Sequence, residues 1–231
     1  MDSRSDMETE LVAQLQVASN SSLFPASRIT TLIQNAYKWA TNLFIWKDLV
    51  KAKTTSTQAG QEYYDYPSEF RSGTIVRLEI DGDPYQRYNF EDYLDYKENN
   101  ASTTKKMFAN YGRYFFVHPT PTSTGSSNMD VWGAIQADEL DDATDETIFT
   151  NNKPEGNEAV VSRAFSVAMK RIDKEASKDA NDESVAILGK LNLDEAKATQ
   201  RDQRLDHPKF NVPNYFGSSR NSGIGQFDYQ P

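Results

Sequence analysis

The segment that decides the fold lies at residues 63–93 and reads YYDYPSEFRSGTIVRLEIDGDPYQRYNFEDY. It opens with an extended aromatic run that stops at Pro67, and it continues after a short turn into residues 74–80, where apolar and polar side chains alternate. Alternation with a period of two is typical of a β-strand. The tetrapeptide at residues 81–84, Asp-Gly-Asp-Pro, then favours a tight reversal. The acidic, aromatic residues from Phe90 to Tyr96 predict a short helix or turn.

Residues 47–137 around this segment read as a β-rich middle. Residues 50–57 and 61–66 are expected to form an antiparallel pair joined near Ala59-Gly60. An aromatic strand at residues 113–118 ends at two nearby prolines, and residues 129–136 are expected to be its hairpin partner across a loop rich in Ser, Thr and Gly.

Apolar residues three and four positions apart predict helices on both sides of this middle, at residues 6–18, 27–45, 157–174 and 182–205. Ser27 is expected to cap the second helix, which has the clearest apolar stripe of the chain. Trp39 and Trp46 lie off the centre of that stripe, so we expect them at the edge of the core; an intersubunit contact is the alternative. Gly189 is expected to be a weak point of the last helix, whose residues 194–204 are almost all charged or small.

The predicted fold class is therefore α+β: a small helical bundle with antiparallel β-hairpin insertions in its middle and an extended C-terminal arm. Residues 1–205 form the body, in which the acidic residues of the stretch 138–158 are expected to face solvent. Residues 206–231 form the arm, since a Pro, Gly, Ser and Asn-rich tail does not fold alone. Spaced aromatic residues suit an arm that docks into a partner's pockets: Phe210, Tyr215, Phe216, Phe227 and Tyr229.

Composition argues against several classes of function. The chain has 231 residues, a net charge of −9 and no cysteine, which excludes thiolate chemistry and disulfides and disfavours tight nucleic-acid binding. Its two histidines, His118 and His207, belong to no metal-ligand pattern, and no nucleophile, phosphate-binding or dinucleotide motif occurs. We therefore expect no catalytic residue, metal or cofactor. The polar N-terminus predicts no signal peptide, and no apolar run is long enough for a membrane span.

The order of these motifs resembles that of the head–tail connector, or adaptor, proteins of tailed bacteriophages. In that family a pattern Y-x-L-P-x-D-F precedes a strand; here Tyr64, Pro67, Glu69 and Phe70 fit it, and Tyr66 replaces the leucine. An aromatic strand that ends in P-x-P also precedes a hairpin in the family. Residues that match the signature of the family's fold are Tyr64, Tyr66, Pro67, Phe70, Tyr114, Pro119, Pro121 and Trp132.

The resemblance implies a non-catalytic virion protein, made in the host cytoplasm and located at the capsid vertex or neck. It implies a homo-oligomeric ring, usually of twelve subunits, that binds the portal protein and the next neck or tail protein. Double-stranded DNA passes through its channel without sequence-specific binding, and no membrane is involved. Two alternatives remain at this stage. One is another neck, tail-completion or stopper subunit. The other is a carbohydrate- or host-binding module that uses Tyr63, Tyr64, Tyr66 and Trp132 as a stacking platform.

Overall fold

A computed structural model describes residues 3–16, 22–99 and 105–206. The chain falls into two units, residues 1–191 and residues 192–231. The first unit contains a helical part and a β part, and the boundary between the units lies inside the last helix. The helices of the helical part are α1 (Arg4–Leu15), α2 (Ala26–Leu43), α4 (Glu155–Met169) and the first part of α5 (Lys174–Asp206). The predicted α+β class is confirmed.

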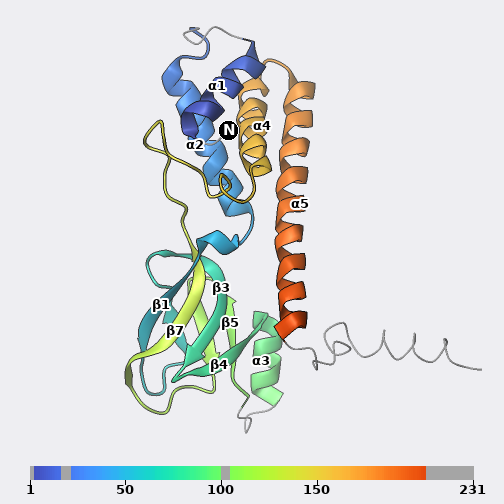
Figure 1. The fold of residues 1–231 in the computed structure, drawn as a ribbon. Coiled ribbons are helices and arrows are strands. Elements are labelled where there is room, and N and C mark those ends of the chain that lie inside the picture. Colours follow the sequence, from blue (N-terminus) through green and yellow to red (C-terminus); the bar gives the residue numbers. More distant parts are fainter. Residues whose placement is uncertain (1–2, 17–21, 100–104, 207–231) are drawn as a thin grey trace, which may run out of the picture. The chain divides into compact units, whose positions relative to one another are not determined.

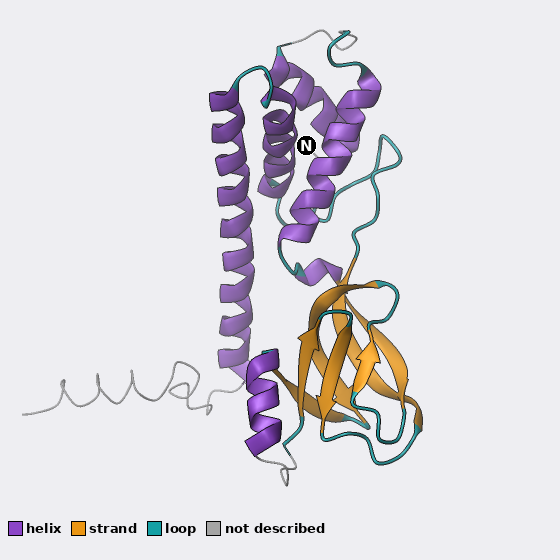
Figure 2. Cartoon of the chain, turned by 180° about the vertical axis from the view of Figure 1, so that it is seen from behind, coloured by secondary structure: helices purple, strands orange, loops and turns teal. Residues whose placement is uncertain are grey.

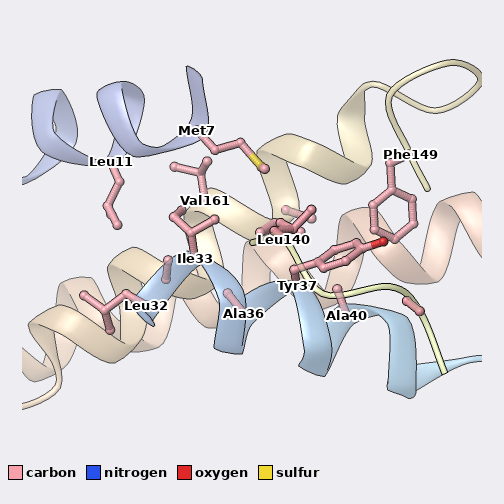
Figure 3. Packing of buried hydrophobic residues seen from close by; sticks show 14 of the residues in the cluster. Met7, Leu11, Leu32, Ile33, Ala36, Tyr37, Ala40, Leu140, Phe149 and Val161 are labelled. Atoms are coloured by element: carbon pink, nitrogen blue, oxygen red, sulfur yellow. The ribbon is translucent and has the colours of Figure 1, made fainter. Parts of the chain in front are cut away.

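The helical core forms around the apolar stripe of α2, which packs beside α1 and α4 (Figures 1 and 3). Ile33 and Ala40 of α2 are completely buried, as are Met7 and Leu11 of α1. The loop between the sheet and α4 adds Phe149, whose ring meets that of Tyr37 edge to face at 6.5 Å. The predicted stripe of α2 is thus the centre of a core built from all three helices.

Several helices begin or end at residues other than the predicted ones, because the residues that cap them are different. Ser27 does not cap α2, because the helix begins at Ala26 after Pro25. Ser3 instead caps α1 in a capping box with Asp6. The predicted helix 157–174 ends at Met169, and α5 begins at Lys174, eight residues before its predicted start. Asp173 explains that start, since its carboxylate accepts the backbone N–H groups of Glu175 (3.0 Å) and Ala176 (3.1 Å).

The helix α5 is continuous through Gly189, so the predicted weak point is not a break in the helix. The first helix ends at Leu15 rather than residue 18, and Ala18 lies outside the described residues. In the stretch 138–158 the acidic side chains are mainly exposed, as expected, while Leu140 and Phe149 anchor it in the helical core.

The β part is a curled sheet (Figure 2). Its seven strands have the order β1-β7-β3-β4-β5-β6-β2; β4 and β5 pair in parallel, and the other pairs are antiparallel. A short 3-10 helix, η1 (Lys47–Leu49), leads from α2 into it. The helix α3 (Phe90–Asn99) connects β4 to β5. The strands are β1 (Val50–Thr57), β2 (Tyr63–Asp65), β3 (Phe70–Ile80), β4 (Asp83–Tyr88), β5 (Met107–Tyr111), β6 (Tyr114–His118) and β7 (Gly125–Ile135).

Two of the expected strand pairings are wrong. β1 pairs with β7 rather than with β2, and β6 pairs with β5 and β2 rather than with β7. The true β5–β6 hairpin turns at residues 112–113, where Gly112 has a φ of 58° and so suits a two-residue turn. The reversal between β3 and β4 is confirmed: Asp81 and Gly82 both have positive φ, as a type I′ turn requires.

The interior of the curled sheet is a second core, separate from the helical one. Ile75, Leu78, Phe115 and Val117 are completely buried in it. Gly133 of β7 allows the ring of Phe70 to approach the backbone, because a Cβ at this position would lie 2.6 Å from that ring. The β part therefore has its own apolar interior, and α3 covers part of its outer face through a further buried cluster of Tyr93, Met107 and Ala109.

Arg71, near the start of β3, joins the β part to the end of α2. Its guanidinium donates to the backbone oxygens of Thr41 (2.8 Å) and Phe44 (3.0 Å) and to Oδ1 of Asn42 (2.8 Å). The last turn of α2 has no basic residue of its own. Arg71 therefore supplies the positive charge and the donors that the C-terminus of a helix requires.

Candidate interaction surfaces

The first family-signature residues lie inside the β part. Tyr64 is 7% exposed and stacks on Phe115, with ring centroids 5.7 Å apart. Tyr66 packs on the same phenylalanine, and burial raises the pKa of its phenol. Phe70 covers Gly133. These three side chains come together, but as part of the core rather than as a binding site.

The prolines of the signature shape connections. The carbonyl of Pro67 accepts the N–H of Phe70 at 2.8 Å, which closes the turn before β3. The carbonyl of Pro121 accepts the N–H of Gly60 at 2.9 Å and so ties the loop after β6 to the loop after β1. Pro119 follows the end of β6 and is half-buried.

Trp132 and Tyr114 are the signature residues on the outside of the sheet. The Arg77 guanidinium lies 4.9 Å from the centre of the Trp132 ring, and Arg77 also pairs with Glu79. Tyr114 of β6 meets Tyr63 of β2 edge to face at 5.3 Å. Because Tyr64 is buried and Trp132 lies on β7, the proposed sugar platform of Tyr63, Tyr64, Tyr66 and Trp132 is not assembled on one face.

A different aromatic group is assembled on the outer face of the sheet. We call it the aromatic surface and define it as Tyr63, Phe90, Tyr111, Tyr114 and Phe116. Phe90 stacks on Tyr111 at 4.0 Å and contacts Phe116 at 5.1 Å, and Phe116 continues to Tyr63 at 6.0 Å. Tyr63 and Tyr111 are 52% and 59% exposed. Exposed, contiguous aromatic residues of this kind are typical of protein interfaces.

The alternation of β6 explains why this surface exists. Phe115 and Val117 point into the core, so Tyr114 and Phe116 lie on the opposite face, where both are half-buried and Phe116 contacts Tyr93 of α3 at 6.3 Å. From the sequence, residues 113–118 were predicted as one aromatic strand, and Phe90, Tyr111 and Phe116 were not predicted to belong to a surface. The signal was present, since a run of alternating aromatic residues places half of them on each face.

The helix α3 flanks the aromatic surface with carboxylates. Asn89 caps this helix, its side-chain oxygen accepting the N–H of Asp92 at 2.8 Å. Beneath the helix, Glu62 accepts the hydroxyl of the buried Tyr93 at 3.0 Å and the ammonium of Lys97 at 2.5 Å. Burial and the charge of Glu62 raise the pKa of Tyr93. This network holds α3 against β2 and β6.

The strand β1 is a second surface of interest. It is paired along one side only, with β7, and most of its residues are exposed on both faces. Lys51 and Lys53 project from it, and Lys53 pairs with Glu69 at 2.8 Å. An edge strand that carries lysines is protected from random association but remains a template for specific pairing.

The two tryptophans near the end of α2 differ. Trp46 is completely buried, donates its indole N–H to the Ala40 carbonyl at 3.1 Å, and meets Phe149 edge to face at 5.1 Å. Trp39 is half-buried and faces the Arg163 guanidinium, 4.5 Å from its ring centre. Trp39 fits the expected core edge, whereas Trp46 belongs to the core itself.

The candidate arm residues Phe210, Tyr215, Phe216, Phe227 and Tyr229 lie outside the described residues. Within the described ranges, no group of three or more His, Cys, Asp or Glu side chains could hold a metal ion. In that same part of the chain, no helix is long and apolar enough to cross a membrane.

The described residues thus form a helical bundle joined to a curled sheet, with aromatic side chains partly exposed on one face of that sheet. The comparison with known families is specific: the model of the SU10 adaptor protein family matches residues 6–209. The chain therefore belongs to the SU10 adaptor protein family, in agreement with its resemblance to phage head–tail adaptors. No curated protein matches the chain.

Proposed function

We propose that this protein forms a ring of twelve subunits beneath the phage portal, prolongs the DNA channel and connects the capsid to the next neck or tail protein. The observation that carries the proposal is the family match over residues 6–209, which spans the helices, the whole sheet and α5. The aromatic surface and the exposed edge strand support it, because a ring subunit needs two different faces for its two neighbours.

In this proposal the C-terminal arm, residues 206–231, docks on the portal. Its five aromatic residues are spaced by polar residues, which suits a segment that fills pockets one side chain at a time. Deleting residues 206–231 should weaken attachment to the portal and leave the far-ultraviolet circular dichroism of the body unchanged.

The channel surface is proposed to be acidic or neutral, since the net charge of the chain is −9. Carboxylates along a channel repel the phosphates of DNA and so allow the duplex to slide. DNA would then pass through the ring without sequence-specific binding.

A reconstruction of the assembled neck tests the proposal. Twelve copies of the chain at the portal vertex are the expected result. A vertex without density for this chain would overturn the proposal, and a Lys/Arg belt around the channel would overturn the channel assignment.

A further inference from the structure

We propose that the aromatic surface of one copy binds the β1 edge strand of a second copy. This inference rests on the proposed ring, and it names the two surfaces that neighbouring subunits use. It requires a heterologous contact, in which one patch of a subunit binds a different patch of its neighbour. Such a contact can be repeated from subunit to subunit around a closed ring.

The first of these surfaces is apolar in its centre. Its outermost side chains, Tyr63 and Tyr111, are more than half exposed, and Leu94 of α3 is 36% exposed beside Phe90, one helical turn away. A tyrosine buried in an interface contributes a large contact area at a small cost in conformational entropy. Phe90 and Phe116 also pack against the buried cluster under α3, so Tyr63 and Tyr111 are the rings that the fold leaves most exposed.

The rim of this surface is negative on the side of α3. Glu91, Asp95 and Glu98 of α3 are exposed, and within the described residues none of them forms an ion pair. By helical spacing, Glu91 and Glu98 lie beside Leu94 on the exposed side of α3. The aromatic surface therefore suits a partner that brings cations to its edge.

The β1 edge supplies that complement. Lys51 and Lys53 lie on the same face of the strand, two residues apart, and Lys51 has no ion-pair partner in the described part of the chain. Ammonium groups bind both carboxylates and the faces of aromatic rings, as Lys105 does in this chain over Tyr88 (4.7 Å) and Tyr96 (4.8 Å). The lysines of one copy thus match the rings and carboxylates of the other in charge and in chemistry.

The packing of the rings favours a protein partner over a glycan. Tyr111 has one face covered by Phe90, and Tyr63 stands at 69° to Tyr114. A sugar stacks on an open, flat ring face, and these tilted and partly covered rings present edges and ridges instead. Ridges of this kind fit between the side chains of another protein surface.

Charge reversal with rescue tests the inference in the full-length chain. The Asp95→Lys/Glu98→Lys variant reverses the rim, and the placement of lysines near the C-terminus of α3 suits the helix dipole. The Lys51→Glu/Lys53→Glu variant reverses the edge. Each alone should reduce ring formation on the portal by about tenfold or more, and the combination of all four substitutions should restore most of it. Asp141→Lys/Asp142→Lys, in the acidic loop before α4, is the matched control and should change nothing.

Crosslinking gives a readout that does not depend on the portal. The chain has no cysteine, so Leu94→Cys and Lys53→Cys together provide the only two thiols for a short bis-maleimide. Covalent dimers and higher species should form at high protein concentration in solution, and should increase on the portal. Each single-cysteine variant should give no species larger than a dimer.

The outcomes separate the inference from the proposed function. Rings on the portal that are unaffected by either reversal, with monomer as the only crosslinked product, would overturn the inference and leave the ring intact. Absence of wild-type rings on the portal would overturn the proposed function, while the crosslinked species in solution would still decide the inference. Binding of soluble oligosaccharides that depends on Tyr63 and Tyr111, without self-association, would also overturn it.

Discussion

Replacing Arg71 by alanine should uncouple the β part from the end of α2. The guanidinium makes three hydrogen bonds of 2.8–3.0 Å, two of them to backbone carbonyls at the C-terminal end of the helix. No basic side chain in the last turn of α2 can take its place. Desolvation lowers the pKa of Arg71, which agrees with a charge held partly inside the protein rather than in water.

The magnitude follows from the number and type of these bonds. A hydrogen bond to a charged group contributes about 1.5–3 kcal/mol, and bonds from one side chain do not add in full. Water can reach Asn42, which is exposed, so part of the loss is recovered. We therefore expect the Arg71→Ala variant to lose about 2–3 kcal/mol of unfolding free energy, with a fall in Tm of about 4–12 °C.

The same strand provides the control. Arg77, six residues further along β3, is 62% exposed and contacts Trp132 and Glu79 on the outer face. Exposed ion pairs contribute about 0–1 kcal/mol, so Arg77→Ala should change the unfolding free energy by less than about 1 kcal/mol. Urea unfolding, followed by circular dichroism and by tryptophan fluorescence, measures the unfolding free energy of both variants. Equal losses of unfolding free energy in the two variants would refute the claim that Arg71 connects the β part to the end of α2.

Three further results are expected. Trp46→Ala should cost about 3–5 kcal/mol in urea unfolding, because a fully buried ring and its bond to Ala40 are removed, whereas the half-exposed Trp132→Ala should cost far less; similar costs would contradict the core assignment. Ser166→Ala should lower stability by about 1–2 kcal/mol, since its hydroxyl donates to the Ser177 carbonyl at 2.7 Å between α4 and α5. Ser162→Ala removes an exposed hydrogen bond from the Ser162 hydroxyl to Glu183 and should have no measurable effect on stability. Burial raises the pKa of Tyr37 to about 12, so its neutral form is favoured in the folded state. The contribution of Tyr37 to stability should therefore fall by about 2 kcal/mol as pH rises from 10 to 12, and Tyr37→Phe should make the decline of stability shallower in unfolding curves taken at each pH.

Local signals predicted the elements well and their partners poorly. The apolar stripe of α2 and the turn at Asp81-Gly82 depend on neighbours in sequence, so both could be predicted. The partner of β1 depends on β7, about eighty residues away, and no turn residue encodes that choice. The adjacency of β1 and β2 in sequence suggested a hairpin that the sheet order excludes.

The contact between Arg71 and the end of α2 could not be predicted from the sequence, and neither could the aromatic surface, for a related reason. Arg71 reaches acceptors about thirty residues earlier in the chain, and Phe90 and Tyr111 meet only because α3 lies on β5 and β6. The five candidate arm residues lie outside the described ranges, so the arm stays a prediction.

The buried cores of the fold leave Tyr63 and Tyr111 exposed on the outer face of the sheet. The interior of the sheet is filled by its own inward side chains, Phe115 and Val117 among them. On the opposite face a further cluster of Tyr93, Met107 and Ala109 lies between α3 and β5, and Phe90 and Phe116 pack against it. The helical bundle has a separate core centred on Ile33 and Ala40. Tyr63 and Tyr111 lie at the margin of this packing and are 52% and 59% exposed, so their apolar area remains available for burial elsewhere. In an SU10 adaptor family member that is proposed to act as a ring, the surface that the fold leaves unused is the surface on which we expect the next subunit to bind.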